Sequence, residues 1–559
     1  MRGHSLIYVV VLLGFLAASL PLFVVPVSGH RLSELFRSRT PAAAELTAAT
    51  KSPRFSARYA KHVHPGRESA HALQSSLWEE TKAQAIQDGQ FRKKEVVGKA
   101  SNSRVFYVTD NNADPTGYYD STRALQATIN QAFNVPTHRE LLPGIPDLGG
   151  VEIHLEGGDY LISSPLQFPS KGGGNLVIHG GSIRASDRFP KDGYLIELWT
   201  AYSQSLRANK TKASLRDRRG HTLTASNEYL AFEKITIRDL LLDANFRGGG
   251  ILVVDSIRVM VENIYVTHFL TDGILVEGGH ETYIHDSFFG QYITSGGDPR
   301  ESSFSGIGIN LISNDNLVSD VVIFSAAYGI SISGQANLIT GVHAYNKATA
   351  FGGVGIYLQL PGYTQTRILG CYLDFTGIIA EDPLGLEIAD SFFLGDGNIL
   401  LRSTKKSHSI YFLTITGNMF EGSSTGTPTV ELDESAGRFT SVYDTVIDQN
   451  TAYGMVLKST VARATLSRTS SWTWKLDLSE RLLFRDFIQN AQYSMYVPGK
   501  DFPRHVLRSV KDNTVIVDTD ARVTGTVSVL VDQSSDSLSL SNSGHRAYFS
   551  TPDSIMEVA

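Results

Sequence analysis

A four-residue unit, in which glycine is followed by isoleucine, any residue and an aliphatic residue, recurs along the middle of the chain. Copies start at Gly250, Gly273, Gly308, Gly329 and Gly355, and a looser copy starts at Gly377. Self-similarity at a period of roughly 20–50 residues is the signature of a solenoid, in which each repeat packs on its neighbours. These repeats are too short to contain the helix that joins parallel strands in other folds. The repeat therefore predicts an all-β parallel β-helix, in which like strands stack rung over rung.

The composition excludes several classes of protein. The 559 residues include 50 Lys and Arg against 56 Asp and Glu, which gives a formal net charge of −6. A slightly acidic chain lacks the basic field of a general nucleic-acid binder, so we expect no nucleic-acid partner. The single cysteine, Cys371, excludes an intramolecular disulfide and a cysteine-based zinc site. No pattern in the sequence indicates a metal site or a cofactor.

Residues 1–29 are typical of a targeting segment. An uncharged apolar run from Leu6 to Gly29 follows the basic Arg2 and ends in small residues, as in a secretory signal peptide. The run is also long enough for an uncleaved type II membrane anchor, but Pro21 and Pro26 interrupt its second half and favour cleavage. We therefore expect a secreted protein, glycosylated at Asn209 of its Asn-Lys-Thr sequon.

Changes in composition and in the pattern of apolar residues divide the rest of the chain into four regions. Residues 30–104 are mixed in character and predict a linker or pro-like segment with one possible helix. Short apolar runs separated by Gly, Asn and Asp predict the β-helix over 105–470. Residues 471–535 lack the repeat and are expected to form a small C-terminal β-rich cap or accessory domain, because a solenoid needs its ends covered. The Ser-rich residues 536–559 predict a mobile tail.

Two groups of segments resemble a known superfamily. Residues 105–110, 114–117, 120–126 and 150–160 are similar to the opening of the pectin-lyase-like superfamily, where a short helix caps a right-handed parallel β-helix. Six central segments resemble the quartet-type plant polygalacturonases, which are divergent family-28 glycoside hydrolases; these are residues 304–306, 314–316, 323–326, 334–337, 345–349 and 380–383. The resemblance covers about residues 105–535. It implies an extracellular glycosidase of the cell wall, which cleaves α-1,4-galacturonosyl linkages of pectin (homogalacturonan) during wall remodelling. We expect the protein to be a monomer.

When the family's motifs are transferred onto this sequence, one of their acidic residues is retained. The motif Asn-Thr-Asp falls on Leu270-Thr271-Asp272, which keeps the aspartate and loses the asparagine. In strict register, Asp-Asp falls on Gly306-Ile307, Gly-His-Gly on Ala327-Tyr328-Gly329, and Arg-Ile-Lys on Tyr357-Leu358-Gln359. The family's paired acids, its histidine and its basic residues are therefore replaced at their usual positions.

The candidate catalytic residues are Asp272, Asp298 and Glu301. Hydrolysis with inversion needs one protonated carboxyl and one carboxylate about 6.5–9.5 Å apart. Because stacked strands lie about 4.8 Å apart, Asp272 and an acid from the insertion that follows its rung could flank one glycosidic bond. The alternatives are structural. Asp272 would be a turn residue that accepts backbone hydrogen bonds, and Asp298 would initiate a turn before Pro299.

Five further residues are candidates for substrate binding, namely Tyr328, His343, Lys347, Tyr357 and Gln359. The tyrosines could stack on sugar rings, and packing between rungs is the alternative. Lys347 and His343 could neutralise the carboxylates of a polyanionic substrate, whereas a structural histidine is the alternative for His343. Gln359 stands at the position of the family's lysine.

Two other functions remain open at this stage. A pectate-lyase-type β-elimination would use a Lys or Arg base, usually with calcium bridging acids and substrate. A catalytically inactive β-helix that binds wall polysaccharide would account for the replaced motifs, because a fold does not determine an activity.

Overall fold

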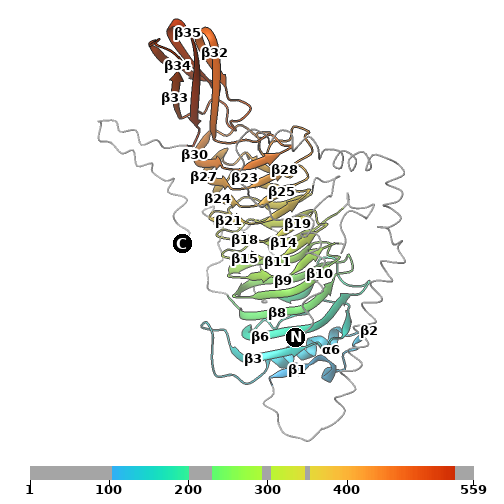
Figure 1. Ribbon diagram of the computed structural model, residues 1–559. Coiled ribbons are helices and arrows are strands. Elements are labelled where there is room, and N and C mark those ends of the chain that lie inside the picture. Colours follow the sequence, from blue (N-terminus) through green and yellow to red (C-terminus); the bar gives the residue numbers. More distant parts are fainter. Residues whose placement is uncertain (1–103, 200–229, 292–303, 346–352, 535–559) are drawn as a thin grey trace, which may run out of the picture. The chain divides into compact units, whose positions relative to one another are not determined.

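The computed structural model describes residues 104–199, 230–291, 304–345 and 353–534 (Figure 1). Parallel strands repeat in three ladders, and each strand pairs with its counterpart one rung away. The first ladder carries the glycine repeat and comprises β5 (Leu166–Gln167), β7 (Tyr194–Leu198), β9 (Gly249–Ile257), β11 (Asp272–His280), β14 (Ile307–Leu311), β17 (Tyr328–Ile332), β20 (Val354–Leu358), β23 (Ile378–Glu381), β26 (Ile399–Arg402) and β29 (Val430–Asp433). The predicted right-handed parallel β-helix is confirmed.

The other two ladders complete each rung. The second comprises β1 (Val105–Tyr107), β3 (Asp147–His154), β6 (Gly173–Ala185), β8 (Phe232–Asp243), β10 (Met260–Thr267), β12 (Tyr283–His285), β15 (Leu317–Ser319), β18 (Leu338–Thr340), β21 (Thr366–Leu369), β24 (Leu384–Ala389), β27 (Ser409–Thr416) and β30 (Ser441–Asp448). The third comprises β2 (Thr116–Asp120), β4 (Asp159–Ile162), β13 (Phe288–Gly290), β16 (Val322–Phe324), β19 (His343–Tyr345), β22 (Tyr372–Asp374), β25 (Phe392–Leu394), β28 (Met419–Glu421) and β31 (Thr451–Tyr453). The long strands β6, β8 and β10 belong to both, since their second halves continue the third ladder.

The glycine repeat has a steric cause in the first ladder. A Cβ placed on Gly329 would lie 2.5 Å from the carbonyl oxygen of Gly355, and one on Gly308 would lie 2.7 Å from that of Gly329. The isoleucine that follows each glycine points inward, and Ile309, Ile330 and Ile356 are fully buried. The repeat therefore marks points where successive rungs approach each other too closely for a side chain.

Buried asparagines hold the turns of neighbouring rungs together. The Asn337 side-chain oxygen accepts hydrogen bonds from the backbone and side-chain nitrogens of Asn316, at 3.0 and 2.8 Å. Asn450 and Asn418 repeat this arrangement further along the solenoid. Because polar groups in the interior are costly unless they are paired, the stacked asparagines stabilise the turns by pairing each other's side chains.

A helix covers the first rungs. The 3-10 turn η1 (Val108–Asn111) precedes β2, and α6 (Thr122–Phe133) follows it. The helix buries Leu125, Ile129 and Phe133 in the same core as the first rungs, and the ring of Phe133 packs edge-on against Phe168. The capping helix implied by the family resemblance is present. No helix within the described ranges is long and apolar enough to cross a lipid bilayer.

The C-terminal part of the described chain is a separate antiparallel sheet. It comprises β32 (Val461–Asp477), β33 (Asn490–Tyr496), β34 (His505–Lys511) and β35 (Thr514–Asp532), with β35 paired to the other three. It has its own core around the fully buried Trp474, whose indole nitrogen donates to the Gly525 carbonyl at 3.1 Å. The boundary predicted between 470 and 471 falls inside β32, so the sheet begins about ten residues earlier than expected.

The lone thiol is expected to be unreactive in the folded protein. Cys371 is 2% exposed, and burial raises the pKa of its thiol to about 11. Since the thiolate is the reactive species, a disulfide reagent at pH 8 should modify Cys371 about a hundredfold more slowly than a free cysteine. Denaturation in guanidinium should restore a normal rate. Rapid modification of the native protein would contradict the buried placement.

Candidate functional site

The outward face of the first ladder carries a row of polar and aromatic side chains. In each rung the residue between two inward-facing ones points outward. Asn310, Ser331 and Tyr357 occupy this position on consecutive rungs, because Asn310 pairs with Ser331 and Ser331 with Tyr357. Asp272 and Tyr328 lie at the start of strands in the same ladder. We call this set of side chains, from Asp272 to Asp433, the outer row.

Asp272 lies at one end of the outer row, in a site built from three rungs. The Tyr194 hydroxyl donates to one carboxylate oxygen at 2.6 Å, and the Asn310 side-chain amide donates to the other at 3.0 Å. Asp272 is 8% exposed. Hydrogen bonds donated to both oxygens favour the negatively charged form, which is the form that a general base must have before it can accept a proton. These contacts join the Asp272 side chain to the next rung, at β14, and to β7 two rungs before it, which the turn interpretation does not require.

A second buried carboxylate shares a partner with Asp272. Glu197, on β7, is 3% exposed and accepts from the Tyr194 backbone nitrogen at 3.0 Å and from the Gln167 amide at 3.0 Å. Tyr194 therefore binds Glu197 through its backbone and Asp272 through its hydroxyl. Glu197 is not among the residues predicted from the sequence. The signal was an acid inside the otherwise apolar strand Tyr194–Leu198.

Aromatic and amide side chains form the middle of the outer row. The rings of Tyr328 and Tyr357 stack with centroids 5.3 Å apart and planes at 19°. Gln359 donates to the Ser331 hydroxyl at 2.7 Å. Burial raises the pKa of Tyr357 to about 12, and the hydrogen bond to Glu381 adds to the shift. Tyr357 is therefore a neutral hydrogen-bond donor at physiological pH.

Charged side chains end the outer row. Glu381 accepts from the Tyr357 hydroxyl at 2.5 Å and from the Leu360 backbone nitrogen at 3.1 Å. Arg402, on the next rung, pairs with Asp433 at 2.8 Å. A hydrogen bond from Ser435, with the Arg402 ion pair, lowers the pKa of Asp433. Each of these acids has a fixed partner, so this end of the row is a set of oriented charges.

Comparison with known proteins identifies the family. The chain is 51% identical over 432 residues to the polygalacturonase QRT3 of Arabidopsis thaliana, a match that covers 77% of this chain and 84% of the relative. The chain belongs to the polygalacturonase family. No model of a known protein family matches it.

Two solved structures similar to this polygalacturonase-family chain are more distant. The A-module of mannuronan C-5 epimerase AlgE6 of Azotobacter vinelandii is 13% identical, with 63% of this chain and 98% of that chain covered and a TM-score of 0.37. A tailspike protein of E. coli bacteriophage HK620 in complex with a pentasaccharide is 10% identical, with 77% and 94% covered and a TM-score of 0.38.

The polygalacturonase motif positions occupy neighbouring rungs. Asp272 pairs with Ile307, and Ile307 pairs with Tyr328. The positions onto which the Asn-Thr-Asp, Asp-Asp and Gly-His-Gly motifs were transferred are thus in register across β11, β14 and β17. Ile307 on the next rung stands where the family has an aspartate, and Tyr328 on the rung after that stands where it has a histidine.

The structure brings together some of the predicted site residues of this polygalacturonase-family chain. Tyr328, Tyr357 and Gln359 share the first ladder with Asp272. His343 does not, because it begins β19 in the third ladder, where its ring stacks on Tyr372 at 4.6 Å. Four predicted residues lie outside the described residues, namely Asp298, Glu301, Lys347 and Asn209.

The acids Glu381 and Asp382 do not act as a pair. Glu381 faces Tyr357, whereas Asp382 is 4% exposed and accepts from the Thr404 backbone nitrogen at 3.2 Å. Among the described residues, no group of three or more His, Cys, Asp or Glu side chains could hold a metal ion.

Proposed function

We propose that this protein is a secreted polygalacturonase that hydrolyses α-1,4-galacturonosyl linkages of pectin in the cell wall. The observation that carries the proposal is the 51% identity with a curated polygalacturonase over most of both chains. The geometry of Asp272 supports it, since a carboxylate with donors on both oxygens can activate water. The partly exposed tyrosine rings and amides of the outer row beyond it are available to a sugar chain.

Asp272 is assigned the role of general base in this proposal. The general acid is assigned to Asp298 or Glu301, which belong to the insertion between β13 and β14 that follows the Asp272 rung. Glu197 is the alternative acid, because it shares Tyr194 with Asp272. The variants Asp298→Asn, Glu301→Gln and Glu197→Gln separate these assignments. The variant that loses hydrolysis but recovers it on a substrate with an activated leaving group identifies the acid, because such a substrate does not need protonation.

The substrate is assigned to the outer row from Asp272 toward Tyr357. Sugar rings would stack on the Tyr328 and Tyr357 pair, and Gln359 would donate to hydroxyl or carboxylate oxygens. Lys347, in the segment after β19, remains a proposed cation for the uronate carboxylates.

Replacement of Tyr328 by Ala is expected to raise KM for polygalacturonate about fivefold to tenfold with a smaller effect on kcat. A lost stacking contact of about 1 kcal/mol corresponds to this factor. Tyr411→Ala is a matched control, because Tyr411 and Tyr443 form a similar stacked pair in the second ladder, with centroids 5.4 Å apart. Equal KM changes in both variants would show that stacking at Tyr328 serves packing alone.

The reaction is tested by measuring reducing ends and ultraviolet absorbance on de-esterified polygalacturonate. New reducing ends without the absorbance of an unsaturated uronate are expected for a hydrolase. Absorbance would instead show β-elimination. The absence of both signals, with retained binding to pectin, would leave a wall-polysaccharide binding protein.

Secretion is tested separately from catalysis. A signal peptide at residues 1–29 predicts a mature protein whose N-terminus begins after Gly29, whereas a type II anchor predicts retention of the full chain in the membrane fraction. Occupied Asn209 predicts a mass shift on removal of N-linked glycans. Light scattering tests the expected monomer.

A further inference from the structure

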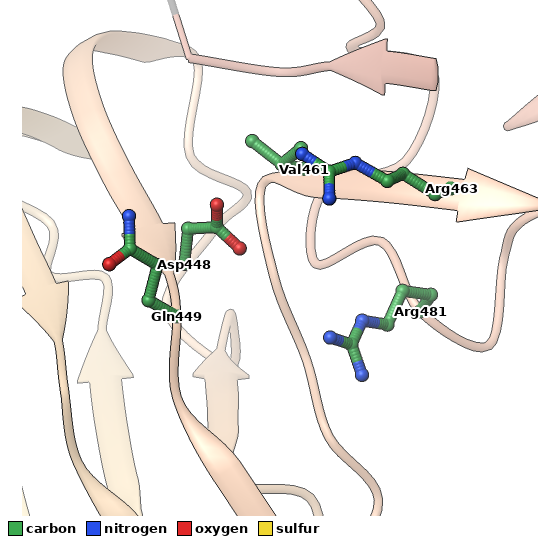
Figure 2. A pocket seen from close by; sticks show the side chains of 5 residues that line it. All are labelled: Asp448, Gln449, Val461, Arg463 and Arg481. Carbon is green, nitrogen blue, oxygen red and sulfur yellow. The ribbon is translucent and has the colours of Figure 1, made fainter. Parts of the chain in front are cut away.

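A pocket of about 650 Å³ lies where β30, the last strand of the second ladder, ends and β32 begins (Figure 2). It is lined by Asp448, Gln449, Val461, Arg463 and Arg481. The volume is within the usual range for sites that hold small ligands or single sugar units. None of its lining residues belongs to the outer row.

Backbone hydrogen bonds fix the elements that carry the lining residues. The Ser459 nitrogen donates to the Arg481 carbonyl at 2.9 Å, and the Leu483 nitrogen donates to the Ser459 carbonyl at 3.0 Å. The Ser459 hydroxyl donates to the Ile447 carbonyl at 2.7 Å and contacts Asp448 at 3.3 Å. The two arginines and the aspartate are therefore presented from backbone that is already paired, so binding has to order their side chains but not the backbone that carries them.

The charges in the pocket are unbalanced. In the part of the chain that the structure describes, neither Arg463 nor Arg481 forms an ion pair or a side-chain hydrogen bond, and the Asp448 carboxylate has one side-chain hydrogen bond, which it accepts from Ser459. Figure 2 shows the three charged side chains around one space, with the Arg463 guanidinium and the Asp448 carboxylate on facing sides. Two cations and one anion leave the pocket with a net positive charge.

The combination of groups selects a particular ligand chemistry. Guanidinium groups favour a carboxylate, which they can bind through paired N–H donors. Asp448 requires a donor on the same ligand, and Gln449 can serve either a donor or an acceptor. A uronic acid has both, since its carboxylate accepts and its hydroxyls donate. A small dianion such as phosphate would bring its charge close to Asp448 and be repelled by it.

We propose that this pocket binds a uronate residue of an acidic polysaccharide as a second site, separate from the catalytic row. The identity of the sugar rests on the proposed function, because a polygalacturonase meets chains of galacturonate. The site would hold a remote part of a long chain or a neighbouring chain, and it would increase retention on pectin without taking part in bond cleavage.

The test measures binding of trigalacturonate, labelled at its reducing end, to the intact protein carrying Asp272→Asn so that the ligand is not consumed. Adding Arg463→Gln and Arg481→Gln is expected to weaken one class of sites at least about thirtyfold, as expected for two lost charge-assisted contacts. Arg468→Gln is the matched control, because it removes an exposed arginine from the same strand, β32, outside the pocket. It should leave binding unchanged.

Two further ligands separate the possible outcomes. Methyl-esterified trigalacturonate should not bind the pocket, and inorganic phosphate should compete weakly. Unchanged affinity in the folded double arginine variant would overturn the proposal, and so would equal binding of phosphate, which would show a general anion site. If the double arginine variant loses the binding and the wild-type protein cleaves no pectin, the proposed hydrolase is refuted and the uronate site is still supported.

Discussion

Replacement of Asp272 by Asn is expected to lower kcat on polygalacturonate about 10²–10⁴-fold, with KM changed little. The substitution preserves the size of the side chain, removes the charge that would accept a proton from water, and replaces one accepting oxygen with an NH2 donor. The amide group introduced by Asp272→Asn would still contact Tyr194 and Asn310, so the fold of the rung should survive. Initial rates of reducing-end formation give the comparison, and circular dichroism shows that both proteins are folded.

Two variants bracket this result. Glu431→Gln removes an exposed carboxylate from the same ladder, on β29, and should leave kcat within about twofold of wild type. Tyr194→Phe removes one hydrogen bond to Asp272 and should give an intermediate loss, because a donor that stabilises the ionised carboxylate is worth about 1.5–3 kcal/mol. Activity of Asp272→Asn within about threefold of wild type would place the base elsewhere.

The hydrogen-bond partners of Asp272 could not be predicted from the sequence. The aspartate itself could be predicted, because the retained Thr271-Asp272 pair lies directly before a repeat glycine. Its partner Tyr194 lies 78 residues earlier, and Asn310 lies 38 residues later. In a solenoid such contacts depend on the number of rungs between two segments, and insertions of variable length hide that number.

The position of His343 shows the same difficulty within one rung. The sequence places it 15 residues after Tyr328, which suggested a shared site. A rung of a β-helix turns through three ladders, so residues close in sequence face different directions. His343 faces outward from the third ladder between aromatic rings, with Phe324 edge-on at 5.5 Å and Tyr372 stacked on it. Only the strand register of all three ladders would have shown that His343 and Tyr328 lie on different ladders.

The fold was more predictable than the site because one steric requirement repeats. Each repeat glycine of the first ladder approaches backbone of the next rung, and the following isoleucine is buried. Both requirements act locally and recur, so they are visible in the sequence. The start of the C-terminal sheet has no comparable repeated pattern in the sequence. Alternating residues from Val461 suit either a further rung or the long antiparallel strand β32, and only pairing with β35 decides between them.

Replacement of Gly329 by Ala is expected to destabilise the protein by about 3 kcal/mol, at the upper end for overpacking. The added Cβ would lie 2.5 Å from the Gly355 carbonyl oxygen, and that oxygen is backbone, which cannot rotate away as a side chain would. The rung must therefore move apart from its neighbour and weaken the hydrogen bonds between β17 and β20. The melting temperature should fall by roughly 5 °C or more.

Gly362→Ala is the matched control, since a Cβ at Gly362 meets no atom within 4 Å. Because alanine restricts the unfolded chain, this variant should be neutral or up to about 1 kcal/mol more stable than wild type. Failure of Gly329→Ala to accumulate as soluble protein, with Gly362→Ala soluble, would be the same effect at greater strength. Equal melting temperatures for the two variants would show that the rungs adjust to the methyl group, and the repeat glycine would then need an explanation other than close approach.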